Sequence, residues 1–405
     1  MLAGKQGCLL PIMPVRELVE TVSHEQADDR TSGSRFYRPE LDILRLIAFL
    51  CVFAVHVLTL SPGAIPADRI IAPMGAYGMC LFFFLSSYLI TELLRRETDA
   101  TGTIHIRSFY IRRILRIWPL YFAFLLFGKI VGYFFPLFHL ENARLLAFVF
   151  LLGNWYLARH GINDSPVGPL WSISLEEQFY LVWPALAKFV GIRALLWCSI
   201  ALLPLAWLTI YLHRGSLPSP LGIEFDGVLW CNTFVQFQYF ALGAIMAITL
   251  RGRSLRLPGY IRIAGLVLGF GIWFLASYLF SLQQFTDHRF ILIGGYALIG
   301  LGCITMFAAL FGASPKIFPK SLIYLGKVSY GLYVFHILFI EIAYLLLRRF
   351  VPALSTSEKS VTHLLLNAIL AIIPTIGLSI LSYRYFETPF LILKKKFTFI
   401  QSRAV

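Results

Sequence analysis

Long apolar runs recur along this chain, and they constrain its fold more than any other feature. Eleven such runs can be distinguished, and most are about 20 residues long, the length that an α-helix needs to cross a bilayer. Hydrophobic residues make up 58% of the 405 residues and charged residues only 14%, whereas soluble domains contain roughly a quarter of charged residues. The sequence therefore predicts an all-α, polytopic membrane helical bundle.

The basic residues between the runs indicate how many of the runs cross the membrane, because short cytoplasmic loops are enriched in Lys and Arg. If the short run 143–157 does not cross, the basic segments 251–256 and 394–396 fall on the same side as the N-terminus. We therefore expect about ten transmembrane helices, one short interfacial or re-entrant helix, and both termini in the cytoplasm. The runs cover residues 41–60, 71–91, 117–137, 143–157, 170–187, 193–212, 228–249, 262–282, 289–311, 321–347 and 363–386.

The chain divides into one long membrane domain and two polar ends. We expect residues 1–36 to form a disordered cytoplasmic tail, residues 37–393 the membrane domain, and residues 394–405 a basic cytoplasmic tail. No signal peptide is predicted, because no basic segment leads directly into an apolar core near the N-terminus. The formal net charge of +14 resides in short loops, which favours a role in topology and phosphate contact over nucleic-acid binding. The six cysteines show no metal-ligand spacing, so no metal site is predicted.

Two ionisable residues in the first apolar run are the clearest candidates for a site. Arg45 and His56 are eleven positions apart, which is almost three helical turns, so they share one helix face and lie about 16 Å apart along its axis. Such groups are costly in a membrane and usually face a cavity. We expect His336 to lie at a similar depth and Asp42 to pair with Arg45. The alternatives are an arginine that reaches the interface and histidines that are only hydrogen-bonded structural residues.

Ordered motifs extend along the whole apolar region. In this order they resemble the motifs of the acyltransferase-3 family of integral membrane acyltransferases. Two positions depart from the family pattern, because Cys80 stands where aspartate is usual and Ser87 where glycine is usual. The motifs are YRPELDILRLIAFLCVFAVH (37–56), GMCLFFFLSSYLI (78–90), FYIRRILRIWPLYF (109–122), PLWSISLEEQFYLVWP (169–184), FVQFQYFALGAIMA (234–247), LGKVSYGLYVFH (325–336) and YFETPF (385–390).

The resemblance implies the chemistry. Family members move an acyl group, often acetyl from acetyl-coenzyme A, to a hydroxyl of a carbohydrate or another acceptor. His56 is the candidate base, because imidazole titrates near neutral pH. Arg45 would lie at the cytoplasmic mouth of the site. Glu177 or Glu176 would orient the histidine or the acceptor, and the sequence does not decide between the two carboxylates.

Donor binding is assigned to a second group of residues. Arg113 and Arg116, with Arg45, are the candidates, because guanidinium groups suit bidentate phosphate binding. The alternative for each is a plain membrane anchor. Ser86 is either a covalent acyl carrier or a helix-packing serine. The structural or auxiliary candidates are Asp42, Ser86, Tyr330, His336 and Glu387.

These motifs also imply the partners and the location. We expect acetyl-CoA or another acyl-CoA as co-substrate, no covalently bound cofactor, and a carbohydrate or lipid-linked glycan as acceptor. The chain should reside in the bacterial cytoplasmic (inner) membrane, in contact with the lipid bilayer. We expect no appended extracytoplasmic hydrolase-like domain, because little sequence follows the closing motif. The alternatives are a membrane transporter and a non-catalytic subunit of an envelope polysaccharide assembly system.

Overall fold

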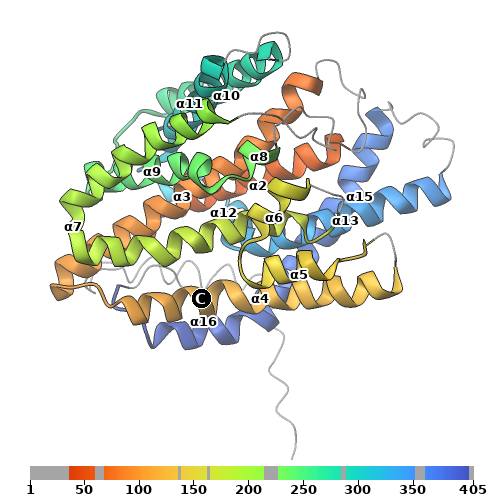
Figure 1. Cartoon of the computed structure of the whole chain (residues 1–405), viewed down its shortest axis with the longest axis horizontal. Coiled ribbons are helices and arrows are strands. Elements are labelled where there is room, and N and C mark those ends of the chain that lie inside the picture. Colours follow the sequence, from red (N-terminus) through yellow and green to blue (C-terminus); the bar gives the residue numbers. More distant parts are fainter. Residues whose placement is uncertain are drawn as a thin grey trace, which may run out of the picture. The chain divides into compact units, whose positions relative to one another are not determined.

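The computed structural model describes residues 36–59, 68–135, 138–161, 165–213, 227–283, 289–351 and 361–400. Every regular element in these ranges is helical (Figure 1). Nine of the described helices are long and apolar enough to cross a membrane. The prediction of an all-α polytopic bundle is confirmed. Most of the predicted N-terminal tail lies outside the described residues, and residues 38–399 form one compact unit.

Nine long helices build this unit, and shorter helices connect them. The long helices are α2 (Pro39–Thr59), α3 (Asp68–Thr101), α4 (Ile106–Phe134), α7 (Trp171–Leu212), α9 (Thr233–Leu250), α10 (Gly259–Gln283), α11 (Arg289–Leu310), α13 (Ser329–Phe350) and α15 (Val361–Leu381). The short ones are α5 (Asn142–Val149), α6 (Gly153–His160), η3 (Gly168–Leu170), α8 (Gly227–Trp230), η4 (Pro315–Ile317), α12 (Lys320–Lys327), η5 (Ser382–Glu387) and α16 (Thr388–Lys395).

The longest helix, α7, reconciles the nine long helices with the ten predicted spans. Its backbone leaves the helical conformation at Gly191, where φ is 77° and ψ is 163°. Glycine tolerates a positive φ because it has no Cβ. The break separates residues 171–190 from residues 192–212, and each part is about as long as a bilayer-spanning helix. The two parts correspond to the predicted runs 170–187 and 193–212.

The short run 143–157 is not one helix but two, α5 and α6, with eight residues each. At 1.5 Å per residue, each is about 12 Å long and cannot cross a hydrocarbon core of about 30 Å. Leu151, between them, has a φ of 58°. We expected one short helix here and did not use Gly153 and Asn154, the two residues inside the run at which α6 begins, as a sign of the break. The structure agrees with the expectation that the run does not cross.

Two further boundaries differ from the expected runs. The run 321–347 is divided at Val328 into α12 and α13, so His336 lies only seven residues after the start of α13 at Ser329. The run 363–386 ends in a π-helical turn, η5, before α16. Such turns are rare and are frequent at functional sites.

Close backbone contacts hold both α3 and α12 against α2. Figure 1 shows α2 beside α3, α10 beside α11, and α4 beside α16. A Cβ on Gly78 would lie 2.4 Å from the carbonyl oxygen of Ala48, so glycine lets α3 approach α2 closely. A Cβ on Gly326 would lie 1.9 Å from the carbonyl oxygen of Asp42. Small residues serve the same purpose at many membrane helix interfaces. The second contact fixes the start of α2, where Asp42 and Arg45 lie.

Candidate active site

The two predicted membrane histidines are in contact. The rings of His56 on α2 and His336 on α13 have centroids 5.0 Å apart and an interplanar angle of 70°. The Nε2 atom of His336 lies 3.4 Å from Nδ1 of His56. His336 is fully buried, whereas His56 is partly exposed. The expectation that they share one depth is therefore confirmed, although α13 begins later than the sequence suggested.

Backbone carbonyls fix the tautomer of both rings. Nδ1 of His56 lies 2.7 Å from the carbonyl oxygen of Val52, and Nδ1 of His336 lies 2.6 Å from that of Tyr333. A carbonyl oxygen can only accept, so each Nδ1 carries a proton and donates. In the neutral form, each Nε2 then carries a lone pair. His56 is left with a free lone pair on Nε2, because that atom accepts no hydrogen bond from the described residues.

Arg45 and Asp42 form the predicted ion pair near the start of α2. Arg45 Nη1 lies 2.8 Å from Asp42 Oδ1, and the Asp42 side chain is almost fully buried. Arg45 is also among the charged neighbours of Glu176 on α7.

Glu177 is held on one side only. Its Oε2 accepts a hydrogen bond from Trp118 Nε1 at 3.0 Å, which ties α7 to α4. Its Oε1 is buried and has no hydrogen-bond partner among the described residues. A buried carboxylate oxygen without a donor is costly, and it is typical of a site that awaits a ligand or a water molecule. Sequence reasoning missed Trp118, although it stands beside Pro119 in the arginine motif.

Glu176 lies beside two hydroxyl groups. Ser86 Oγ on α3 makes a hydrogen bond with Tyr180 Oη on α7, and both residues are electrostatic neighbours of Glu176. A serine engaged in this way joins α3 to α7, which favours the packing alternative for Ser86. Glu176 and Glu177 diverge around the helix, yet both have Arg113 among their charged neighbours. The sequence predicted that at most one of the two carboxylates faces the site, and this stays a prediction.

Arg113 points into the protein rather than outward as an anchor would. Its guanidinium carbon lies 5.4 Å from the ring centroid of Phe109 and 5.5 Å from that of Tyr180. Its Nε is buried and has no hydrogen-bond partner among the described residues. Arg116 and Glu177 are both among its charged neighbours. Arg113 Nε–H and Glu177 Oε1 are thus one buried donor and one buried acceptor without hydrogen-bond partners among the described residues.

Two tyrosines of the late motif join this region to the histidines. Tyr330 donates to the carbonyl oxygen of Ile117 at 2.8 Å, which fixes α13 against α4. The Tyr333 hydroxyl donates to the carbonyl oxygen of Pro169 at 2.6 Å, and its ring centroid lies 5.4 Å from that of His336. Glu176 is among the charged neighbours of both tyrosines. Tyr333, which sequence reasoning missed, thus connects η3, directly before α7, with His336.

The remaining predicted residues lie at the end of α4 that carries its arginines. Glu387, in the π-helical turn, accepts from Ser382 Oγ at 3.1 Å and has Arg116 as a charged neighbour. Lys394 on α16 has Arg112 among its basic neighbours and was not singled out from the sequence. Its place beside the arginines depends on the packing of α16 against α4, which no local pattern reveals. Within the described ranges, no group of three or more potential ligands forms a metal site.

Cys80, the main departure from the family pattern, lies away from the histidine pair. Its Sγ is 3.9 Å from Gln236 Oε1 on α9, and Cys303 on α11 is a neighbour. The side chain is fully buried. The cysteine therefore belongs to the packing of α3 against α9 and α11, whereas His56 and His336 lie where α2 meets α13.

Comparison with known proteins identifies the family. A family model described as an acyltransferase domain matches residues 38–384, most of the chain. The chain belongs to the acyltransferase-3 family. The peptidoglycan O-acetyltransferase OatA of Listeria monocytogenes is 29% identical over 385 residues, covering 89% of this chain and 56% of that protein. A Staphylococcus aureus protein provisionally named an O-acetyltransferase is 27% identical, covering 87% of this chain and 57% of its own.

These similarities confirm the resemblance read from the motifs. A Bacillus subtilis protein provisionally named the peptidoglycan O-acetyltransferase YrhL is 28% identical, with 87% of this chain and 55% of that protein covered. The chain spans a little over half the length of these relatives. No solved structure matches it. Family membership and the apolar helices identify an integral membrane protein of an acyltransferase family, which favours an enzyme over the transporter alternative.

Proposed function

We propose that the chain is a membrane O-acyltransferase that moves an acetyl or other acyl group from a coenzyme-A thioester to a hydroxyl of a carbohydrate. The names of the relatives favour a cell-wall glycan such as peptidoglycan as the acceptor class. The observation that carries the proposal is the locked tautomer of His56, which leaves a lone pair on Nε2 inside the membrane domain. A neutral imidazole with a free nitrogen is the usual general base near neutral pH.

The proposed step needs one proton shuttle. The acceptor oxygen attacks the thioester carbonyl carbon while its proton passes to His56 Nε2. The carbon–sulfur bond then breaks, and the leaving thiolate takes the proton from His56, so the products are an ester and the free thiol. His336 supports the charged intermediate, because its Nε2 lies 3.4 Å from Nδ1 of His56 and can share the proton that Nδ1 donates to the carbonyl oxygen of Val52. A hydrogen bond from a charged donor is stronger than one from a neutral donor.

The donor is proposed to enter from the end of the bundle where α4 begins. Arg113 and Arg116 would bind its phosphates, and its acyl arm would pass Glu176 and Glu177 toward the histidines. We place this end in the cytoplasm of a bacterium, with the protein in the inner membrane and both termini cytoplasmic. One contact supports a shared side for the basic loops, because Arg38, at the start of α2, donates to the carbonyl oxygen of Gly252 at 3.0 Å.

The direct test is acyl transfer by purified protein in nanodiscs. The donor is acetyl-CoA with a labelled acetyl group, and the acceptors are soluble peptidoglycan fragments and lipid-linked glycan precursors. The expected product is a base-labile acetyl ester on the glycan, detected by mass spectrometry, together with one free thiol for each ester formed. Transport of an acceptor or donor across the membrane without any ester product would contradict the proposal.

A further inference from the structure

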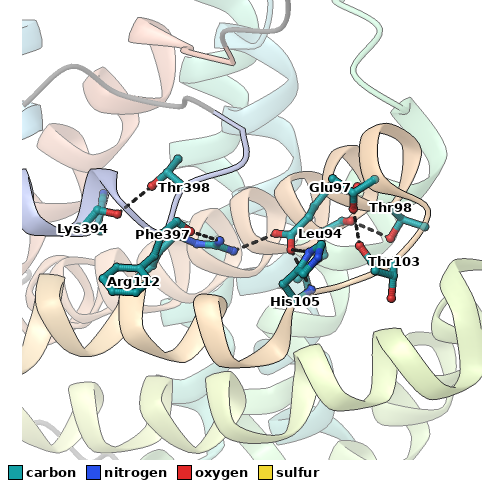
Figure 2. A network of polar contacts seen from close by, with 10 residues as sticks. Leu94, Glu97, Thr98, Thr103, His105, Arg112, Lys394, Phe397 and Thr398 are labelled. Carbon is teal, nitrogen blue, oxygen red and sulfur yellow. Dashed lines mark hydrogen bonds and ion pairs between the residues drawn. The ribbon is translucent and has the colours of Figure 1, made fainter.

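The segment that follows the last membrane helix is bound to the rest of the unit. Figure 2 shows the network, which joins the end of α3, the start of α4 and residues 394–398. Arg112 donates to the carbonyl oxygen of Phe397 at 2.7 Å and to Glu97 Oε2 at 2.9 Å. Glu97 Oε1 also accepts from the backbone N–H of His105 at 2.9 Å. Glu97 is almost fully buried, so this is a built contact and not a loose surface pair.

A second contact fixes the same segment. The rings of His105 and Phe399 are stacked, with centroids 4.2 Å apart and an interplanar angle of 23°. The Thr398 hydroxyl donates to the carbonyl oxygen of Lys394 at 3.0 Å, which continues the turn beyond α16. We call the set Glu97, His105, Arg112, Phe397 and Phe399 the C-terminal latch. The latch fixes the segment directly after α16, the helix that carries Lys394 and packs against α4.

Lys394 is placed among cations. Its charged neighbours include Arg112, Arg113 and Arg116 of α4, all with the same sign, and its side chain is partly buried. Arg112 has a carboxylate partner in Glu97. Glu177 and Glu387 are charged neighbours of Arg113 and Arg116, respectively, but no ion pair within the described residues involves Arg113, Arg116 or Lys394. Like charges brought together in a partly buried site repel one another, unless an anion binds between them.

Arg113 supplies an independent observation that points to a ligand. Its Nε is buried without a hydrogen-bond partner in the described part of the chain, although the guanidinium is held in place by Phe109 and Tyr180. A planar guanidinium presents N–H groups in a fork that matches two phosphate oxygens, and an ammonium adds a point charge beside it. A phosphate oxygen would supply the acceptor that Arg113 Nε lacks among the described residues.

We propose that Lys394, held by the C-terminal latch, completes a phosphate site with Arg113 and Arg116 for the nucleotide part of the acyl-CoA donor. This inference rests on the proposed function and extends it, because it adds a residue outside the recognisable motifs and assigns a role to the segment after the last membrane helix. The arm that carries the thioester extends from the nucleotide toward Glu176 and Glu177. The phosphates remain at the end of the bundle where α16 packs against α4.

The first experiment measures donor binding and turnover for Lys394→Gln, with Lys396→Gln as the matched control. Lys396 is exposed at the end of α16 and has the same charge. Loss of one charge-assisted contact that contributes about 1.4 kcal/mol to binding weakens the affinity for the donor about tenfold. We expect the KM for acetyl-CoA to rise about tenfold in Lys394→Gln, with kcat and the acceptor KM unchanged, and no change in Lys396→Gln. Equal donor KM values for wild type and Lys394→Gln would overturn the proposal.

Two further arms identify the anion. Acyl-dephospho-CoA lacks the 3′-phosphate. If the wild type and Lys394→Gln have the same KM for this analogue, Lys394 binds the 3′-phosphate. If Lys394→Gln raises the KM for this analogue as much as it raises the KM for acetyl-CoA, Lys394 binds the diphosphate. All measurements are made in nanodiscs of phosphatidylcholine alone and repeated with anionic lipid. If the Lys394→Gln effect occurs only with anionic lipid, Lys394 binds a lipid headgroup, and the proposal is wrong.

The latch is tested by Phe399→Ala, which removes the stacked ring but no charge. As a positioning change, it should raise the donor KM in the same direction as Lys394→Gln, by a smaller factor, and leave kcat unchanged. Direct binding of coenzyme A to the wild-type protein and to the variants tests the proposed donor separately from the proposed role of Lys394. If the wild type binds no coenzyme A, the proposed donor is wrong. If it binds coenzyme A but Lys394→Gln and Phe399→Ala bind equally well, only the further inference is wrong.

Discussion

Replacement of Gln178 separates structural from chemical roles within the motif 169–184. Its Nε2 donates to the carbonyl oxygen of Leu151 at 2.9 Å and to Asn154 Oδ1 at 2.8 Å. Its Oε1 accepts from Thr233 Oγ1 at 2.7 Å. Asn154 completes the network by donating to the carbonyl oxygen of Cys231 at 3.0 Å. These bonds hold α6 and the start of α9 against α7, and they make Gln178 a structural residue.

The magnitude follows from the bonds that Gln178→Ala removes. Three hydrogen bonds are lost, and the carbonyl oxygen of Leu151 and the amide oxygen of Asn154 are left without this donor. Hydrogen bonds between membrane helices average about 0.6 kcal/mol, and those in soluble proteins contribute about 0.5–1.5 kcal/mol. The free energy of unfolding should therefore fall by about 2–4 kcal/mol for the three bonds together.

Glu177→Gln is the matched variant one residue earlier. Glutamine keeps the volume and an oxygen for Trp118, but it replaces the unpartnered carboxylate oxygen by an amide group. Removal of a buried charge with a single hydrogen bond should leave stability unchanged or raise it. We expect Glu177→Gln to lose acyl transfer at normal stability, and Gln178→Ala to lose stability at a normal donor KM.

The assay combines thermal unfolding in detergent, followed by tryptophan fluorescence, with acyl transfer per folded molecule. A loss of 2 kcal/mol or more lowers the unfolding midpoint by at least a few degrees in a chain of this size. The reasoning would be refuted if Gln178→Ala unfolded at the wild-type temperature while its donor KM rose. That result would place Gln178 in contact with the substrate.

Three further predictions follow from the same contacts. Replacement of Arg113 or Arg116 by Ala should raise the donor KM more than the acceptor KM. Replacement by Lys should restore the donor KM only in part, because an ammonium lacks the forked N–H groups. Unchanged donor kinetics in the double Ala variant would leave both residues as membrane anchors. Cysteines introduced near Gly252 and Lys395 should react with membrane-impermeant reagents only from the side of the N-terminus, and labelling from outside would overturn the ten-span topology. Ser86→Ala should retain most acyl transfer. If an acyl group can be trapped on Ser86 in the wild type, and Ser86→Ala loses both this adduct and the activity, Ser86 is a covalent acyl carrier after all.

Helical periodicity made much of the site predictable. The eleven-residue spacing places Arg45 and His56 on one face, and the three-residue spacing gives the Asp42–Arg45 ion pair found at 2.8 Å. Both are properties of one helix, so they need no knowledge of its neighbours. For His56 and His336 only a similar depth was predicted; their contact, and the helix break at Val328, were not.

Features that depend on contacts between distant segments could not be read from the chain. The sequence left Arg113 open between a donor-binding residue and a membrane anchor, and only the structure shows its guanidinium carbon 5.5 Å from the ring centroid of Tyr180 on α7. Tyr333 and Trp118 acquire their roles only from helices that approach them from elsewhere in the chain. A hydropathy pattern reports burial but not which neighbour causes it, which is why the two glutamates could not be placed.

Acyl transfer by His56→Gln measures the central claim most directly. Glutamine preserves hydrogen bonding at this position but cannot accept a proton at neutral pH. With Nε2 of His56 as the base, the variant should insert and accumulate normally while its rate of labelled acetyl transfer falls by about 10²–10⁴-fold. His336→Gln, measured alongside, should be milder, because that ring only supports its neighbour. Near-normal transfer by His56→Gln at matched protein levels would contradict the account and move the search for the base to Glu176 or Glu177.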